Sequence, residues 1–175
     1  RRPTTVKTRV IAHHQQVVRV DREERSALPE AVIGRLIGAV TKRLPSADAV
    51  VIEDYGKGVI TRQLLESVLP AARRHRALVT VDPKEEHFDL YQRVTALTPN
   101  RAEAGGALGR DLEADADVER AGREILGRLS CAGVLITLGE DGMRLFERGR
   151  RPVRIPTVAQ EVFDVAGAGD TVIAT

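Results

Sequence analysis

Short apolar runs that alternate with helical patterns constrain the fold of this chain more than any other feature. Residues 48–53 (DAVVIE), 77–81 and 133–138 have the length and composition of buried strands. Segments with Leu and Val at helical spacing, such as 31–40, lie between them. Strands that alternate with helices predict an α/β fold with a mostly parallel sheet.

The expected elements can be given in chain order. We predict strands at 4–12, 16–20, 48–53, 77–81, 94–97, 133–138, 143–147 and 153–155, and helices at 31–40, 61–69, 117–129 and from Gly167 onward. The first two strands favour a hairpin, and an antiparallel arrangement is one option for the last two. Thr61 is a suitable N-cap for the helix that follows it.

Polar motifs stand where four of the predicted strands end. They occupy residues 54–58 (DYGKG), 82–84 (DPK), 100–103 (NRAE) and 137–142 (TLGEDG). The carboxyl ends of parallel strands meet at one edge of a sheet, where α/β proteins bind ligands. The sequence therefore predicts a ligand site at this edge.

Composition excludes several classes of protein. No apolar run reaches the roughly 18 residues of a membrane helix. The first residues, RRP, show no signal peptide, and the lone Cys131 excludes an intramolecular disulfide, so we expect a cytoplasmic protein with no membrane partner. Aromatic residues make up 3% of the chain and the net charge is +2, which disfavours nucleic-acid binding. The basic residues within 1–26 suit an anionic small molecule better.

The segment 164–171 (DVAGAGDT) is the sharpest candidate for chemistry. Small residues followed by a helix start allow close approach of a phosphate to free N–H groups. Asp170 lies in the first turn, where a carboxylate suits a general base that activates a hydroxyl. A glycine-rich turn with an acidic residue complementing the helix dipole explains the same residues equally well.

Other candidates favour ordinary structural roles. The chain contains neither a Walker phosphate loop nor the dinucleotide fingerprint G-x-G-x-x-G. His13 and His14 would point to opposite faces of a strand, which disfavours a shared metal. Cys131 is expected to be a small core residue, and the acidic residues within 113–119 a solvated helix start.

Residues 155–171 (IPTVAQEVFDVAGAGDT) resemble the D-x-x-G-A-G-D signature of the ribokinase-like (PfkB) carbohydrate kinases. The motifs at 54–58, 100–103 and 137–142 resemble the D-Y-x-K-G, N-x-x-E and T-x-G-x-x-G motifs of that family, in the same order. The resemblance covers essentially the whole chain. It implies a ribokinase-like three-layer fold in which residues 1–22 are lid strands and 23–175 a catalytic core, incomplete at both ends.

The resemblance implies roles for the phosphoryl-transfer residues. Asp170 would deprotonate the sugar hydroxyl, and Gly167, Ala168 and Gly169 would form an anion hole for the transferring group. Asn100 and Glu103 would organise Mg²⁺ and the phosphates of ATP, with Glu103 acting through water.

The resemblance also implies roles for residues that bind the nucleotide and for residues that neutralise phosphate charge. Thr137, Gly139 and Gly142 would line the nucleotide site. Lys57, on the substrate side, and Lys84, on the nucleotide side, would neutralise phosphate charge, with ordinary surface lysines as the alternative for both.

The N-terminal part, with the runs RPTTVKTR, HHQQ and RVDRE, is most similar to the D-glycero-β-D-manno-heptose 7-phosphate kinases within the family. This implies phosphorylation of that sugar phosphate at its anomeric hydroxyl in ADP-heptose biosynthesis, and a homodimer formed through the lid strands. Lys7, Arg9 and Arg19 would hold the 7-phosphate, with solvated strand residues as the alternative. A kinase of another sugar and a non-catalytic nucleotide-binding or dimerisation module are the competing hypotheses.

Overall fold

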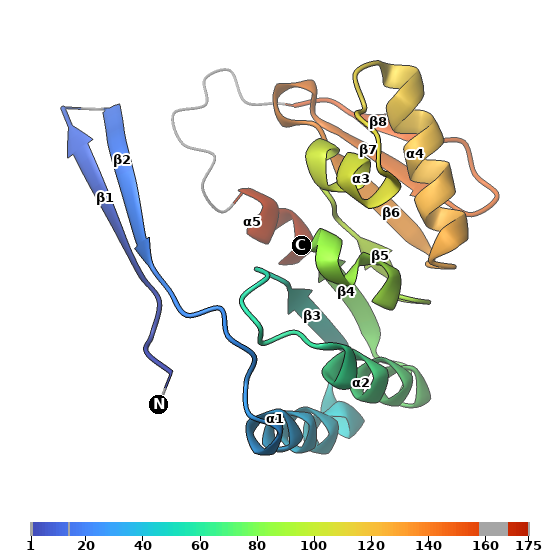
Figure 1. The fold of residues 1–175 in the computed structure, drawn as a ribbon. Coiled ribbons are helices and arrows are strands. Elements are labelled where there is room, and N and C mark those ends of the chain that lie inside the picture. Colours follow the sequence, from blue (N-terminus) through green and yellow to red (C-terminus); the bar gives the residue numbers. More distant parts are fainter. Residues whose placement is uncertain (1, 14, 158–167, 175) are drawn as a thin grey trace.

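The computed structural model describes residues 2–13, 15–157 and 168–174 of the 175-residue chain (Figure 1). The elements are β1 (Val6–Ala12), β2 (Gln15–Arg22), α1 (Glu30–Arg43), η1 (Leu44–Ser46), β3 (Ala49–Glu53), α2 (Arg62–Arg74), β4 (Leu78–Asp82), η2 (Glu85–Leu90), β5 (Ala96–Leu97), α3 (Arg101–Leu108), α4 (Asp115–Arg128), β6 (Gly133–Thr137), η3 (Gly139–Asp141), β7 (Met143–Glu147), β8 (Val153–Ile155) and α5 (Ala168–Ala174).

Six strands form one sheet in the order β3-β4-β5-β6-β7-β8. The strands β3 to β6 are parallel, and β7 and β8 are antiparallel to their neighbours. The predicted α/β class with a mostly parallel sheet is therefore confirmed. A separate antiparallel hairpin of β1 and β2 precedes this sheet, as the N-terminal pattern predicted.

The core lies on one face of the sheet. Val81, Leu97 and Val134 are cross-strand neighbours, and each is fully buried. Side chains alternate between faces along a strand, so this row defines the buried face, which packs beneath α2 and α4. On the opposite face, Val51 and Leu78 are about half exposed.

Helix starts follow the local chemistry of the sequence. The Oγ1 atom of Thr61 accepts a hydrogen bond from the Leu64 N–H at 3.2 Å, which confirms the predicted N-cap of α2. The helix α3 was not predicted, because Gly105 and Gly106 weaken helical propensity in its short sequence. Its start is stabilised by a capping box formed by Asn100 and Glu103.

The two faces of the β1–β2 hairpin differ sharply. Lys7 pairs with Asp21 and Arg9 with Arg19, so these four residues share one charged face. The other face carries Val6, Val10, Val18 and Val20, each about half exposed. Figure 1 shows the hairpin standing apart from the sheet, beyond the carboxyl end of β3.

None of the helices in the described part of the chain combines the length and the apolar composition that crossing a membrane requires.

Candidate functional site

The four predicted polar motifs meet at the carboxyl edge of the sheet. The last residues of β3 and β4, Glu53 and Asp82, are register partners. A parallel bridge joins Thr137, the last residue of β6, to Asn100 in the segment that follows β5. The backbone N–H of Asp54 continues this ladder with a 3.0 Å hydrogen bond to the Asp82 carbonyl. The predicted convergence of the motifs is thus confirmed as a feature of the fold.

Asn100 and Glu103 are locked together at the start of α3. The Oδ1 atom of Asn100 accepts from the Glu103 N–H at 2.9 Å, and Glu103 Oε2 accepts from the Asn100 N–H at 3.0 Å. The spacing of the N-x-x-E motif therefore has a structural cause, since it is the spacing of a capping box.

The second carboxylate oxygen of Glu103 binds Lys84. Lys84 Nζ donates to Glu103 Oε1 at 2.6 Å, which joins the loop after β4 to α3. This hydrogen bond to the carboxylate raises the pKa of Lys84 above its usual value, so the lysine is a cation at neutral pH. Its side chain is 41% exposed, and it can therefore contact a ligand at the edge as well.

The segment 137–142 folds against the start of α3. The Thr137 N–H donates to the Pro99 carbonyl at 3.0 Å, and Arg101 pairs with Asp141 at 2.9 Å. Gly142 has a φ of +83°, and a Cβ atom there would lie 2.2 Å from the Ile155 carbonyl oxygen. Glycine is therefore required at Gly142 by backbone packing, and Gly139, with a φ of +62°, also adopts a conformation that favours glycine.

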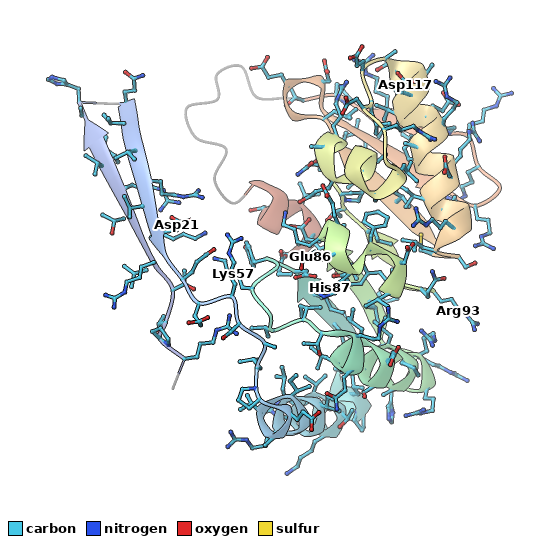
Figure 2. The ribbon with its side chains drawn as sticks, in the orientation of Figure 1. Asp21, Lys57, Glu86, His87, Arg93 and Asp117 are labelled. Atoms are coloured by element: carbon cyan, nitrogen blue, oxygen red, sulfur yellow. The ribbon has the colours of Figure 1, made fainter. Side chains whose placement is uncertain are left out.

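Lys57 lies on the side of the carboxyl edge that faces the hairpin. Its Nζ atom pairs with Glu23 Oε2 at 2.7 Å, just after β2 ends. Figure 2 shows Lys57 between the hairpin and the sheet. The ring of Tyr55 lies under two cations, 5.7 Å from Lys57 Nζ and 5.8 Å from Lys7 Nζ. The Lys57 and Arg25 side chains lower the pKa of Glu23.

Lys7, Arg9 and Arg19 share the charged face of the hairpin. The contact of Lys7 with Tyr55 turns this face toward the loop 54–58. Arg19 pairs with Asp21 at 2.9 Å, and both Arg9 and Arg19 are solvent-exposed. The structure therefore groups the three predicted 7-phosphate ligands, but Lys7 is the one whose contact with the edge is defined.

A buried hydrogen-bond network at Asp54 was not predicted. Asp54 Oδ2 accepts from the Tyr91 hydroxyl at 2.6 Å and contacts His87 Nδ1 at 2.7 Å, while Oδ1 accepts from the Gly56 N–H at 2.8 Å. The Asp54 and Tyr91 side chains are almost fully buried. We call Asp54, His87 and Tyr91 the Asp54 network.

The helix α5 contains the last three residues of the D-x-x-G-A-G-D signature, 168–170, and lies at the same end of the sheet. It packs against β3 and β4, with Ile173 buried (Figure 1). The backbone of Ala168, Gly169 and Asp170 forms its first turn. Gly167 lies outside the described residues, so its predicted role in the anion hole stays a prediction, as do those of the three residues that follow it.

The donor set at Glu103 and Asn100 suits Mg²⁺ in its chemistry. Both residues offer hard oxygen atoms, and a carboxylate oxygen already bound by one donor retains a lone pair for a metal-bound water. Within residues 2–13, 15–157 and 168–174, no group of three or more His, Cys, Asp or Glu side chains is arranged to hold a metal ion directly.

The remaining predictions concern structural residues. Cys131 is buried in the core, as predicted, and burial raises the pKa of its thiol to about 11. Asp115 and Asp117 lie in the first turn of α4, which confirms the helix start. His13 has a φ of 55° in the turn of the hairpin, and His14 lies outside the described residues.

Comparison with known proteins agrees with the motifs. Residues 1–175 match the pfkB family carbohydrate kinases. "Bifunctional protein HldE" of Pelobacter propionicus is 45% identical over 174 residues, which cover 99% of this chain and 36% of the relative. The protein of the same name from Desulfatibacillum aliphaticivorans is 41% identical over 172 residues, covering 98% of this chain and 35% of the relative. The chain thus spans about a third of the length of these curated relatives.

The fold has solved counterparts. Phosphofructokinase-2 from Escherichia coli, in a structure "in complex with substrates and products", superposes with a TM-score of 0.74 at 18% identity and covers 97% of this chain and 55% of that one. This similarity confirms the fold. The family match extends over the full sequence, and the chain belongs to the pfkB family of carbohydrate kinases.

Proposed function

We propose that this member of the pfkB family is the core of an ATP-dependent kinase of D-glycero-β-D-manno-heptose 7-phosphate. The convergence of the motifs 54–58, 82–84, 100–103 and 137–142 with α5 at one sheet edge carries the proposal. The product would be the 1,7-bisphosphate, an intermediate on the way to ADP-heptose for the lipopolysaccharide core. In this proposal residues 1–22 act as lid and 23–175 as catalytic core.

Asp170 acts as general base in the proposed reaction. Its carboxylate takes the proton of the anomeric hydroxyl as that oxygen attacks the γ-phosphorus of ATP. The new bond forms between oxygen and phosphorus, and the bond from phosphorus to the β–γ bridging oxygen breaks, so that ADP leaves. The backbone N–H groups of Gly167, Ala168 and Gly169 stabilise the charge on the transferring group.

The nucleotide is proposed to bind over the start of α3 and the segment 137–142. Thr137, Gly139 and Gly142 line this part, and Lys84 faces the phosphates with its charge. Glu103 and Asn100 would hold Mg²⁺ through its water shell, and the ion would neutralise phosphate charge when bound. The capping box fixes the positions of both residues before any ligand arrives.

The sugar phosphate is proposed to bind between the hairpin and the sheet. Lys7, Arg9 and Arg19 lie on the charged face of the hairpin, and Lys57 lies at its base. A phosphate held there is remote from the reacting hydroxyl, so its binding energy can orient the sugar against Asp170. This arrangement favours a substrate that already carries a phosphate.

The apolar face of the hairpin supports a homodimer as the assembly. Val6, Val10, Val18 and Val20 are about half exposed on a two-stranded ribbon, which has little independent stability. A second copy would cover these valines. Replacing Val18 with Asp is expected to give monomers in analytical ultracentrifugation, and a monomeric wild-type protein would contradict the dimer.

The test of the proposed function is Mg²⁺-dependent phosphoryl transfer by the full-length protein, followed by ³¹P NMR of the sugar. We expect a new anomeric phosphate on heptose 7-phosphate and little product from ribose or fructose. Equal efficiency with ribose or fructose would favour the alternative of a kinase for another sugar. Absence of turnover, with ATP still bound, would favour a non-catalytic nucleotide-binding or dimerisation module.

A further inference from the structure

The Asp54 network has no role in the phosphoryl transfer proposed above. Asp54 lies directly after β3, whereas His87 and Tyr91 lie in and just after η2, which follows the motif 82–84. The Asp54 side chain is 1% exposed and accepts three hydrogen bonds, two of them from side chains. A buried carboxylate with this many donors holds its position firmly, because leaving any donor unpaired is costly.

The two side chains that donate to Asp54, those of Tyr91 and His87, can keep their hydrogen bonds at neutral pH. Burial and the bond to Asp54 raise the pKa of the Tyr91 hydroxyl far above its usual value, so it stays protonated and keeps donating. His87 faces the carboxylate with Nδ1, which places the donated proton on that nitrogen. The network therefore joins the loop 54–58 to η2 under ordinary conditions.

The loop 54–58 in turn holds the base of the hairpin. Lys57 pairs with Glu23, and the Lys57 carbonyl accepts a hydrogen bond from the Arg2 guanidinium. Gly58 approaches the chain just after β2 so closely that a Cβ atom would lie 2.8 Å from the Ser26 carbonyl oxygen. Tyr55 lies beneath Lys7 of β1. The loop 54–58 thus contacts the base of the hairpin both where the chain enters β1 and where it leaves β2.

We infer that the Asp54 network is a positioning unit, which sets the hairpin over the carboxyl edge and so controls capture of the sugar phosphate. His87 and Tyr91 act through Asp54 and the loop, without touching the substrate. The identity of the substrate rests on the proposed function, whereas the connection from η2 to the hairpin rests on the contacts described above. The unit links the segment after β4 to the substrate side of the site.

Amide hydrogen exchange in the full-length protein tests the connection without any need for activity. Tyr91→Phe removes one donor but keeps the ring, and His87→Ala removes the other. We expect exchange over 6–22 and 54–58 to rise about tenfold in each variant, the effect of losing one hydrogen bond to a charged group. Exchange in 100–103 and 133–137 should stay unchanged.

Two further variants separate positioning from general damage. His87→Asn places an amide donor near the position of Nδ1 and should restore slow exchange in the hairpin. His75→Ala removes an exposed histidine at the end of α2 and should change nothing. Unchanged hairpin exchange in Tyr91→Phe and His87→Ala would overturn the inference. A uniform rise that includes β4 and β6 would also overturn it.

Steady-state kinetics distinguish positioning of the hairpin from a general structural role, because only positioning changes the KM of one substrate and leaves the other unchanged. In Tyr91→Phe, the KM for the sugar phosphate should rise about tenfold while the KM for ATP stays within about twofold. Equal increases in both constants would contradict a role in substrate capture. If the wild-type protein shows no kinase activity, the proposed function fails, and the exchange comparison still decides whether the network positions the hairpin.

Discussion

Two lysines at the carboxyl edge of the sheet each bind a glutamate, and the two pairs join different parts of the molecule. Lys57 and Glu23 connect the loop after β3 to the base of the hairpin, at 2.7 Å. Lys84 and Glu103 connect the loop after β4 to the first turn of α3, at 2.6 Å. We call the first region, where the sugar phosphate is proposed to bind, the substrate half, and the second, where ATP is proposed to bind, the nucleotide half.

The halves differ in how firmly the glutamate is held. Glu103 also completes a capping box, so the backbone of α3 fixes its position. Glu23 is held by the side chains of Lys57 and Arg25. We therefore expect the proposed nucleotide half to be preformed in the fold, and the proposed substrate half to adjust through its side-chain ion pairs when the sugar phosphate binds.

The largest expected effect is at the junction of the halves. Asp170→Asn removes the proposed base, so turnover should fall about 10²–10⁴-fold. Nucleotide binding, measured by calorimetry, should stay close to wild type because the nucleotide half is untouched. Near-normal turnover in this variant would remove Asp170 from the mechanism.

Charge on the hairpin should affect one substrate and spare the other. We expect Lys7→Ala and Arg9→Ala each to raise the KM for heptose 7-phosphate about tenfold or more, since a charged hydrogen bond to phosphate is lost. The KM for ATP should change little. Steady-state kinetics with each substrate in turn will measure this.

Arg22→Ala is the matched control for the hairpin. Arg22 pairs with Val6 and so lies on the apolar face. Its loss should leave the KM for the sugar phosphate unchanged. An effect as large as that of Arg9→Ala would show that overall positive charge matters and that the charged face has no special role.

Matched substitutions of the two glutamates should separate the halves. Glu103→Gln keeps a residue that can complete a capping box but loses the charge opposite Lys84, so the KM for ATP should rise about tenfold. Glu23→Gln should instead raise the KM for the sugar phosphate. The comparison fails if both variants affect the same substrate.

The smallest expected effect is a shift in the pH at which the Glu23 carboxylate titrates. The pKa of Glu23 is lowered from 4.5 by Lys57 and Arg25. A carboxylate with a lowered pKa in the folded state stabilises the fold at pH values above its ordinary pKa. This stabilisation is lost as the pH falls through the lowered pKa. Carbon NMR should therefore place the Glu23 titration below pH 4.5, and Lys57→Met should move it upward. An identical midpoint in the variant would exclude the pairing in solution.

Most of the fold follows from local sequence patterns. Runs such as 48–53 and 133–138 are apolar and short enough for strands, and Thr61 caps its helix as its chemistry suggests. The helix α3 was missed because two adjacent glycines oppose helix formation. The helix forms nevertheless, because the capping box of Asn100 and Glu103 stabilises its start and Ala104 packs into the core.

The candidate site was predicted in part. The convergence of the motifs followed from the rule that parallel strands end at one edge. The partners of Lys57 and Lys84 did not follow, because each glutamate lies far away in the sequence and could be chosen only once the chain was folded. The Asp54 network was missed for the same reason, since Asp54 and Tyr91 are 37 positions apart.

The division into two halves can be tested most directly by hydrogen exchange with one ligand at a time. In the full-length protein, a non-hydrolysable ATP analogue should protect 100–103 and 137–142 and leave the hairpin unchanged. Heptose 7-phosphate should protect 6–22 and 54–58. Protection of the hairpin by the nucleotide alone, or no protection of it by the sugar phosphate, would contradict the division.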